Sequence, residues 1–173
     1  MHSPYDRGVS RTVRRVAVGS DMQHETANAI AGHLEEGGYA VVRCGAVGGP
    51  DTPWPAVAEH VARLVATGGA DTAVLCCWTG TGVSIAANKV PGVRAALCIN
   101  PEVARGARRW NDANVLAIGL CTTDADTGRA IVDAWLEHTE VDPGEADNIA
   151  GVSQLEQRYG AAAAPRTPAA SPQ

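Results

Sequence analysis

Residues 72–82 read TAVLCCWTGTG, a run of small and apolar residues that ends in a turn with two glycines. A run without polar alternation is typical of a strand that is buried on both faces of a parallel sheet. The pattern that follows the turn, through Ala87, indicates a helix. This succession of buried strand, tight turn and helix predicts an α/β protein.

Four further apolar runs, each followed by a helical pattern, lie on either side of this stretch. After the first of them, Ala27, Ile30 and Leu34 recur at helical spacing. Five strands that alternate with helices predict right-handed crossovers and a parallel sheet covered on both faces. Ligands of such sheets bind beyond the carboxyl ends of the strands, so candidate residues follow the first, third and fourth strands. The other expected strands are residues 16–19, 40–44, 93–98 and 114–119, and a last helix is expected from about 145 to 158.

Length and composition indicate one globular domain. The chain has 173 residues, 45% of them hydrophobic, and a formal net charge of −5. We assign the domain to residues 15–160, because the polar arm at 1–14 and the Ala/Pro-rich tail at 161–173 are typical of disordered ends. No apolar run is long enough to span a membrane, and the first residues lack the apolar region of a secretory signal. We therefore expect a cytoplasmic protein without a membrane partner.

Charge and cysteine content exclude other classes. Mild acidity argues against a nucleic-acid partner, which would require a basic face. The five cysteines are odd in number and include an adjacent pair, so they form neither a disulfide framework nor a CxxC metal pattern. We expect no metal and no cofactor.

The turn formed by Thr79, Gly80, Thr81 and Gly82 is a candidate anion site. Its backbone N–H groups can point to one place, and the following helix adds its positive end. The turn is not a phosphate-binding Walker loop, and Ile85 occupies the position of the third glycine of a dinucleotide fingerprint. A tight turn without a ligand is the alternative.

Three polar side chains lie near this turn. Cys77 precedes it, and a thiol near a helix N-terminus is suited to act as a base or nucleophile, although buried strand cysteines are also common as small hydrophobic residues. Asp21 ends the first strand, where it could cap the next helix or bind a ligand hydroxyl. His24 is the histidine closest to the expected site, and the other four show no spacing typical of a metal site.

Three segments together closely resemble the type B ribose-5-phosphate isomerases and their galactose-6-phosphate isomerase relatives. They are GTGVSIAANKVPGVRAALC at 80–98, NDANVL at 111–116 and IVDAWL at 131–136. The resemblance covers about residues 15–140. It implies a Rossmann-like three-layer sandwich with a five-stranded parallel sheet, a homodimer with sites at the subunit interface, and metal-free aldose–ketose isomerisation of a sugar-like substrate.

The resemblance also implies residue roles. Cys77 corresponds to the base that removes the proton beside the carbonyl, with Thr79 behind it. The amides of residues 80–82 would stabilise the enediolate, which needs hydrogen-bond donors aimed at its developing charge. Asp21 corresponds to an aspartate that binds sugar hydroxyls, and Asn111 to an asparagine that follows a ring-opening histidine.

The chain departs from this family pattern at several positions. A C-terminal arginine pair is absent, and residues 145–149 are acidic instead. Arginine is the side chain that holds phosphate by bidentate contacts. We therefore predict that ribose 5-phosphate is turned over poorly or not at all. Met22 replaces the histidine after the aspartate, Trp110 the ring-opening histidine, Trp78 the glycine after the base, Trp54 a tyrosine, and Cys121 a phosphate-binding arginine.

Three functions remain open at this point. The first is isomerisation of an altered substrate, such as an unphosphorylated or open-chain sugar or another α-hydroxycarbonyl compound. The second is a non-catalytic relative that binds a small molecule or a partner protein. The third is epimerisation or tautomerisation, with His24 or Glu102 as a second acid–base group. The residues also leave open whether Trp78 and Trp110 stack on a ligand or fill the pocket.

Overall fold

Five parallel strands form one sheet, as the alternating pattern predicts. The structure is a computed structural model that describes residues 14–137 and 140–160. The strand order is β2-β1-β3-β5-β4, and every neighbouring pair is parallel. This arrangement confirms the expected Rossmann-like α/β architecture. The strands are β1 (Arg15–Ser20), β2 (Ala40–Gly45), β3 (Thr72–Cys77), β4 (Ala95–Leu97) and β5 (Val115–Gly119).

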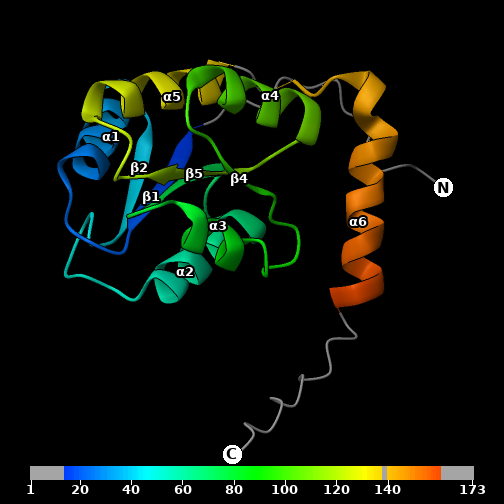
Figure 1. Cartoon of the computed structure of the whole chain (residues 1–173), viewed down its shortest axis with the longest axis horizontal. Coiled ribbons are helices and arrows are strands. Elements are labelled where there is room, and N and C mark those ends of the chain that lie inside the picture. Colours follow the sequence, from blue (N-terminus) through cyan, green and yellow to red (C-terminus); the bar gives the residue numbers. More distant parts are fainter. Residues whose placement is uncertain (1–13, 138–139, 161–173) are drawn as a thin grey trace, which may run out of the picture.

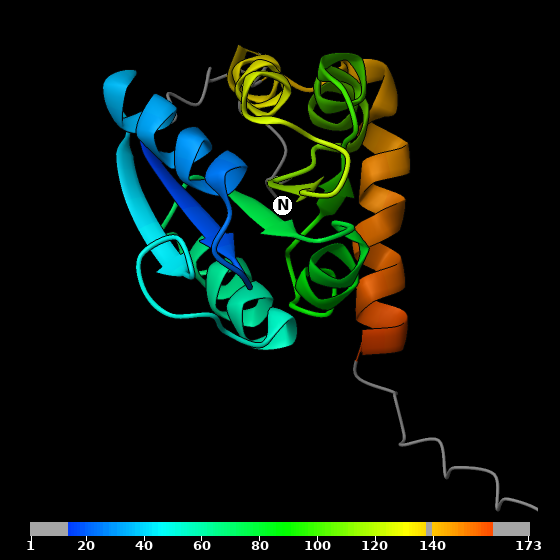
Figure 2. The same cartoon turned by 60° about the vertical axis from the view of Figure 1, so that its left-hand side comes forward.

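Helices cover both faces of this sheet (Figure 1). The first, fourth and fifth helices pack on one face and the second and third on the other. A sixth helix runs along one side of the sandwich (Figure 2). The helices are α1 (Glu25–Glu36), α2 (Trp54–Ala66), α3 (Thr81–Ala87), α4 (Pro101–Asn111), α5 (Ala125–Glu137), the 3₁₀ turn η1 (Pro143–Glu145) and α6 (Ala146–Gly160).

The central strand is as buried as its sequence indicates. All six residues of β3 are buried. Its first residue also fixes α5, because the fully buried Trp135 donates its indole N–H to the Thr72 hydroxyl at 2.9 Å. That hydroxyl donates in turn to the carbonyl of Asn114 at 2.9 Å. A large aromatic side chain is thus buried with its polar atom satisfied.

One strand is shorter than expected. We predicted a strand over residues 93–98, whereas β4 spans three residues. The backbone N–H of Arg94 is bonded to the side-chain oxygen of Asn114 at 2.8 Å, and its side chain reaches the carbonyl of Asp112 at 2.7 Å. A side chain therefore takes the place of a backbone acceptor for the N–H of Arg94, while its carbonyl still accepts the N–H of Asn114 at 3.0 Å.

The order of the strands determines where a site can form. From β1 the chain crosses to β2 on one side of the sheet, and from β2 it crosses back to β3 on the other side of β1. The order of the strands therefore reverses at β1. This reversal marks the usual ligand position in open α/β sheets, at the carboxyl ends of β1 and β3. The predicted arm and tail fall outside the described residues, except for Arg14. Within the described ranges, no helix is long and apolar enough to cross a membrane.

Candidate active site

The turn after β3 is fixed by a glycine that no other residue could replace without strain. Gly80 has a φ of 74°. A Cβ there would lie 2.5 Å from the Leu97 side chain and 2.8 Å from the backbone nitrogen of Gly119. Gly80 precedes α3 and provides no side-chain cap. The first N–H groups of a helix have no partner within the helix, and the first helical bond of α3 runs from Ser84 to the carbonyl of Gly80. The amides of residues 80–83 are therefore donors without a partner within α3.

Cys77 lies at the end of β3, directly before this turn. It is paired in register with Gly119 of β5. The residue is 5% exposed, and its side chain belongs to the core cluster on the α2 and α3 face. In the single chain, Cys77 is therefore packed within this core and almost closed to solvent.

The segment after β5 runs alongside the turn. The N–H of Leu120 donates to the carbonyl of Cys77 at 3.0 Å, and that of Cys121 donates to the carbonyl of Trp78 at 2.8 Å. Cys121 is exposed. Cys121, which the family resemblance aligns with a phosphate-binding arginine, thus lies next to Trp78, the residue that follows the candidate base Cys77.

Asp21 leaves the sheet beside Cys77, because its neighbour Ser20 is paired with Cys76. Its Oδ1 atom is buried and has no hydrogen-bond partner among the described residues. Burial raises the pKa of Asp21 above its ordinary value, the backbone N–H groups of Asp21 and Met22 offset part of this rise, and the charge of Asp51 adds a smaller increase. A buried acceptor without a donor is rare in native proteins, so this oxygen is suited to accept a ligand hydroxyl.

The fully buried Cys76 lies between these groups, because it is paired with Ser20 and precedes Cys77. Burial, and to a smaller extent the charges of Cys77 and Asp21, together raise the pKa of Cys76 to about 12. The capping role considered for Asp21 is wrong, because His24 caps α1. Its Nδ1 atom accepts the N–H of Thr26 at 3.2 Å.

Aromatic side chains flank the turn on its solvent side. The Trp54 ring lies 3.2 Å from the position that a Cβ of Gly82 would take, so it packs on the turn. Trp54 is 44% exposed and Trp78 is 56% exposed. In the single chain, neither ring fills a buried pocket. The hydroxyls of Thr79 and Thr81 are bonded to each other at 2.7 Å.

Two predicted site residues are not brought to this place. Helix α4 leaves the carboxyl edge of the sheet after β4 and returns to the amino edge before β5. Its end is held there, because Asp112 pairs with Arg94 at 2.7 Å, just before β4 begins. Trp110 and Asn111 therefore lie at the opposite edge of the sheet from Cys77. Within one chain, the predicted site residues therefore do not all lie together.

The candidate second acid–base groups are engaged elsewhere. The Nδ1 atom of His24 accepts the backbone N–H of Thr26. The Glu102 carboxylate accepts a hydrogen bond from Arg105 at 2.7 Å. Met22 is half-buried against the core cluster on the α1 face. One ring nitrogen of His24 and the carboxylate of Glu102 are thus held by local contacts.

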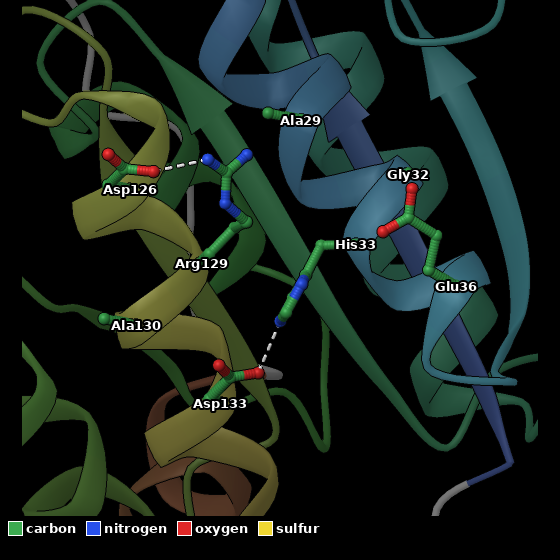
Figure 3. A pocket seen from close by; sticks show the side chains of 8 residues that line it. All are labelled: Ala29, Gly32, His33, Glu36, Asp126, Arg129, Ala130 and Asp133. Carbon is green, nitrogen blue, oxygen red and sulfur yellow. Dashed lines mark hydrogen bonds and ion pairs between the residues drawn. The ribbon is translucent and has the colours of Figure 1, made fainter.

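A groove of about 550 Å³ lies between α1 and α5, away from the turn (Figure 3). His33 and Asp133 bridge it at 2.6 Å, and Arg129 pairs with Asp126 on α5. None of the residues predicted for the site lines it. Over the described ranges, no three His, Cys, Asp or Glu side chains are arranged to hold a metal ion.

Comparison with known proteins gives consistent matches over the whole sandwich. The ribose/galactose isomerase family model matches residues 16–151. Ribose-5-phosphate isomerase B of Escherichia coli is 36% identical over 151 residues, which are 84% of this chain and 99% of that protein. D-erythrulose-4-phosphate isomerase of Pectobacterium atrosepticum is 30% identical over 145 residues, 83% of this chain and 95% of that protein. The solved ribose-5-phosphate isomerase B of Clostridium thermocellum has a TM-score of 0.79 at 37% identity, over 84% of this chain and 99% of that one.

Proposed function

The chain belongs to the ribose/galactose isomerase family, and on this premise we propose that it is an aldose–ketose isomerase acting through an enediolate on a sugar other than ribose 5-phosphate. One observation supports a working site above all others. The buried Oδ1 atom of Asp21 has no partner among the described residues and lies beside Cys77 at the end of β3. A substrate hydroxyl that donates to this atom would supply the hydrogen bond that it lacks.

The proposed reaction uses Cys77 as the base. Its thiolate takes the proton from the carbon next to the carbonyl, and the C–H electron pair forms the carbon–carbon double bond of an enediolate. The amides of residues 81–83 face the oxygen that gains charge, where donors in a desolvated site are most effective. The thiol then returns the proton to the former carbonyl carbon, while the hydroxyl proton moves between the two oxygens.

The substrate proposal is supported by the charges near the site. Cys121, beside Trp78, stands where the family resemblance places an arginine. The segment at the start of α6 carries Glu145 and Asp147 in place of an arginine pair. Because a phosphate dianion is held mainly by arginine or lysine, we expect ribose 5-phosphate to bind weakly. The relative named D-erythrulose-4-phosphate isomerase makes four-carbon sugars the first to test.

We also propose that the site is completed in a homodimer. Trp110 and Asn111 lie at the opposite sheet edge from Cys77, so in one chain they cannot act together. In a symmetric dimer, the end of α4 in one copy can face the β3 turn of the other. Several large apolar side chains of α3, α4 and α6 that such an interface could cover are exposed in the single chain: Ile85, Val103, Trp110, Val152, Leu155 and Tyr159.

The test of the proposed reaction is proton exchange. The full chain is incubated in deuterated water with a panel of three- to five-carbon aldoses and ketoses, with and without phosphate, and deuterium next to the carbonyl is measured by NMR. We expect exchange with the native chain and none with Cys77→Ser. The matched control is Cys44→Ser, a buried cysteine of the same core cluster, which should retain exchange. Equal exchange with Cys77→Ser contradicts the proposal.

A second candidate function is favoured by the burial of Cys77. A thiol that is 5% exposed is also typical of a structural residue, and a non-catalytic sugar-binding relative would keep Asp21 and the turn. In that case, sugars would raise the melting temperature of the native chain and of Cys77→Ser equally, without any exchange.

A further inference from the structure

We infer that Asp51 is a positioning residue that keeps the Asp21 carboxylate free for substrate, by accepting the backbone N–H to which Asp21 would otherwise bond. The inference rests on the proposed function and adds a residue from a different loop to the same site. It is carried by the hydrogen bonds of the segment that connects β1 to α1.

An aspartate in such a connection commonly bonds to its own backbone. Its side-chain oxygen accepts the N–H of the residue two positions on, which for Asp21 is the N–H of Gln23. This bond is absent, because the Oδ1 atom of Asp21 is buried without a partner. The N–H groups of Asp21 and Met22 stabilise the carboxylate less than burial destabilises it, since the net effect is a raised pKa.

Asp51 takes the missing donor. The N–H of Gln23 donates to the Oδ1 atom of Asp51 at 3.0 Å. Asp51 lies between β2 and α2, and two more bonds hold its loop against the same segment. The N–H of Thr52 donates to the Asp21 carbonyl at 2.9 Å, and the side-chain amide of Gln23 donates to the Gly49 carbonyl at 2.7 Å. The acceptor that displaces Asp21 from its usual bond is therefore held in place on both sides.

Helix α1 does not engage Asp21 either. His24 caps it, since its Nδ1 atom accepts the N–H of Thr26 at 3.2 Å and leaves Nε2 out of the cap. The Ser20 hydroxyl donates to the carbonyl of Met22 at 2.8 Å, so it is also directed to the backbone. The two side chains nearest to Asp21 in the connection thus satisfy the backbone and leave the carboxylate alone.

The charge of Asp51 matters less than the donor that it takes. This charge raises the pKa of Asp21, but it does so less than the neighbouring backbone N–H groups lower it. Asp51 is exposed, and water and salt screen exposed charges. Two other ionisable groups lie beside Asp21 on β3: Cys77 and Cys76, whose pKa is raised in part by the charge of Asp21. His24 follows three residues later. A variant that keeps the acceptor and removes the charge can therefore separate the two effects.

The first experiment measures the pKa of the Asp21 carboxyl by carbon-13 NMR, without substrate. Asp51→Ala frees the N–H of Gln23, which should then donate to Asp21 and lower its pKa. Asp51→Asn removes the same charge but keeps an oxygen for this N–H, so it should lower the pKa much less. Gln23→Ala removes the side-chain bond to Gly49 and should leave the pKa unchanged. Equal pKa values in the two Asp51 variants, or a fall of the same size in Gln23→Ala, overturn the inference whether or not the protein is an enzyme.

The second experiment follows the same variants by deuterium exchange with ribose and erythrulose. Asp51→Ala should raise KM about 2–10-fold with kcat nearly unchanged, because a substrate hydroxyl must then displace one backbone hydrogen bond. Asp51→Asn and Gln23→Ala should keep the native KM. A native KM in Asp51→Ala, with exchange retained, overturns the inference and leaves the proposed function standing. Absence of exchange in the native chain counts against the proposed function, and the carboxyl pKa values then decide the inference alone.

Discussion

Among single residues, Asp21 has the environment that departs most from that of a surface carboxylate. Its Oδ1 atom is buried without a partner, and burial raises its pKa. Both effects disfavour the charged form, and a hydroxyl that donates to Oδ1 would supply the missing hydrogen bond. Under the proposed function, Asp21 therefore lowers the stability of the protein without substrate, as groups at functional sites commonly do.

We predict that Asp21→Asn weakens substrate binding and changes how stability depends on pH. A carboxyl whose folded pKa is raised binds protons more strongly in the native state, so native stability falls as pH rises from its ordinary value of 3.8 through the raised folded value. The Asn variant lacks this loss, so its melting temperature should exceed that of the native chain increasingly over this window. KM should rise about 10–100-fold, as expected for a lost hydrogen bond to a charged group. Parallel melting curves across the pH range would contradict this account.

Gly80 fixes the turn through its backbone rather than through chemistry. We predict that Gly80→Ala lowers the free energy of unfolding by about 2–6 kcal/mol, because a left-handed non-glycine residue and an overpacked side chain each cost roughly 1–3 kcal/mol. Gly32→Ala is the matched control, since a Cβ at this helical position meets nothing within 4 Å, and it should be neutral or slightly stabilising. Urea denaturation of both variants measures the difference.

At the scale of elements, α5 is anchored to the sheet by one polar relay within the core. The Trp135 indole donates to the Thr72 hydroxyl, which donates to the Asn114 carbonyl. Thr72→Val keeps the shape but leaves the buried indole N–H without an acceptor. We predict a loss of about 1–3 kcal/mol in unfolding free energy, read from urea denaturation. Thr67→Val, which removes an exposed bond to the Arg63 carbonyl, should change it by less than about 0.5 kcal/mol. Equal losses in the two variants would contradict the importance of the relay.

The elements themselves could be predicted because their hydrophobic periods differ. The unbroken run in β3 and the helical spacing in α1 each have one simple physical reading. The length of β4 could not be predicted in the same way. The N–H of Arg94, just before β4, is bonded by the side chain of Asn114, and a long-range contact of this kind leaves no periodic signal.

The proximity of Asp21 and Cys77 could be predicted, because strand ends determine it. Asp21 and Cys77 follow adjacent strands of the same sheet, so their proximity follows from the alternating pattern. The same pattern contains the information that separates Trp110 and Asn111 from them, because a crossover helix returns to the amino edge before the next strand. That the Oδ1 atom of Asp21 lacks a hydrogen-bond partner, and that His24 caps α1, both depend on side-chain packing, which the sequence alone does not show.

At the scale of the whole molecule, the exposed apolar side chains and the split site point to the same assembly. α6 is held to the sandwich by Glu156, which accepts the N–H of Gly92 at 3.0 Å, and by the buried Ile149. Its Val152, Leu155 and Tyr159 face solvent in the single chain. The proposed dimer requires a second copy that covers this face and places the end of one α4 against the other β3 turn.

The composite site predicts complementation between two inactive chains. Cys77→Ser removes the base, and Asn111→Ala removes a group that the partner copy would supply. In a dimer of one chain of each kind, one site carries both defects and the other carries neither. Random pairing makes half of the dimers mixed, so about a quarter of native activity should return when the two variants are co-expressed. Differently tagged chains, light scattering for the oligomeric state, and activity of the doubly purified mixed dimer provide the measurement. Activity no higher than that of the two parent variants, in a preparation shown to contain mixed dimers, would place the whole site within one chain.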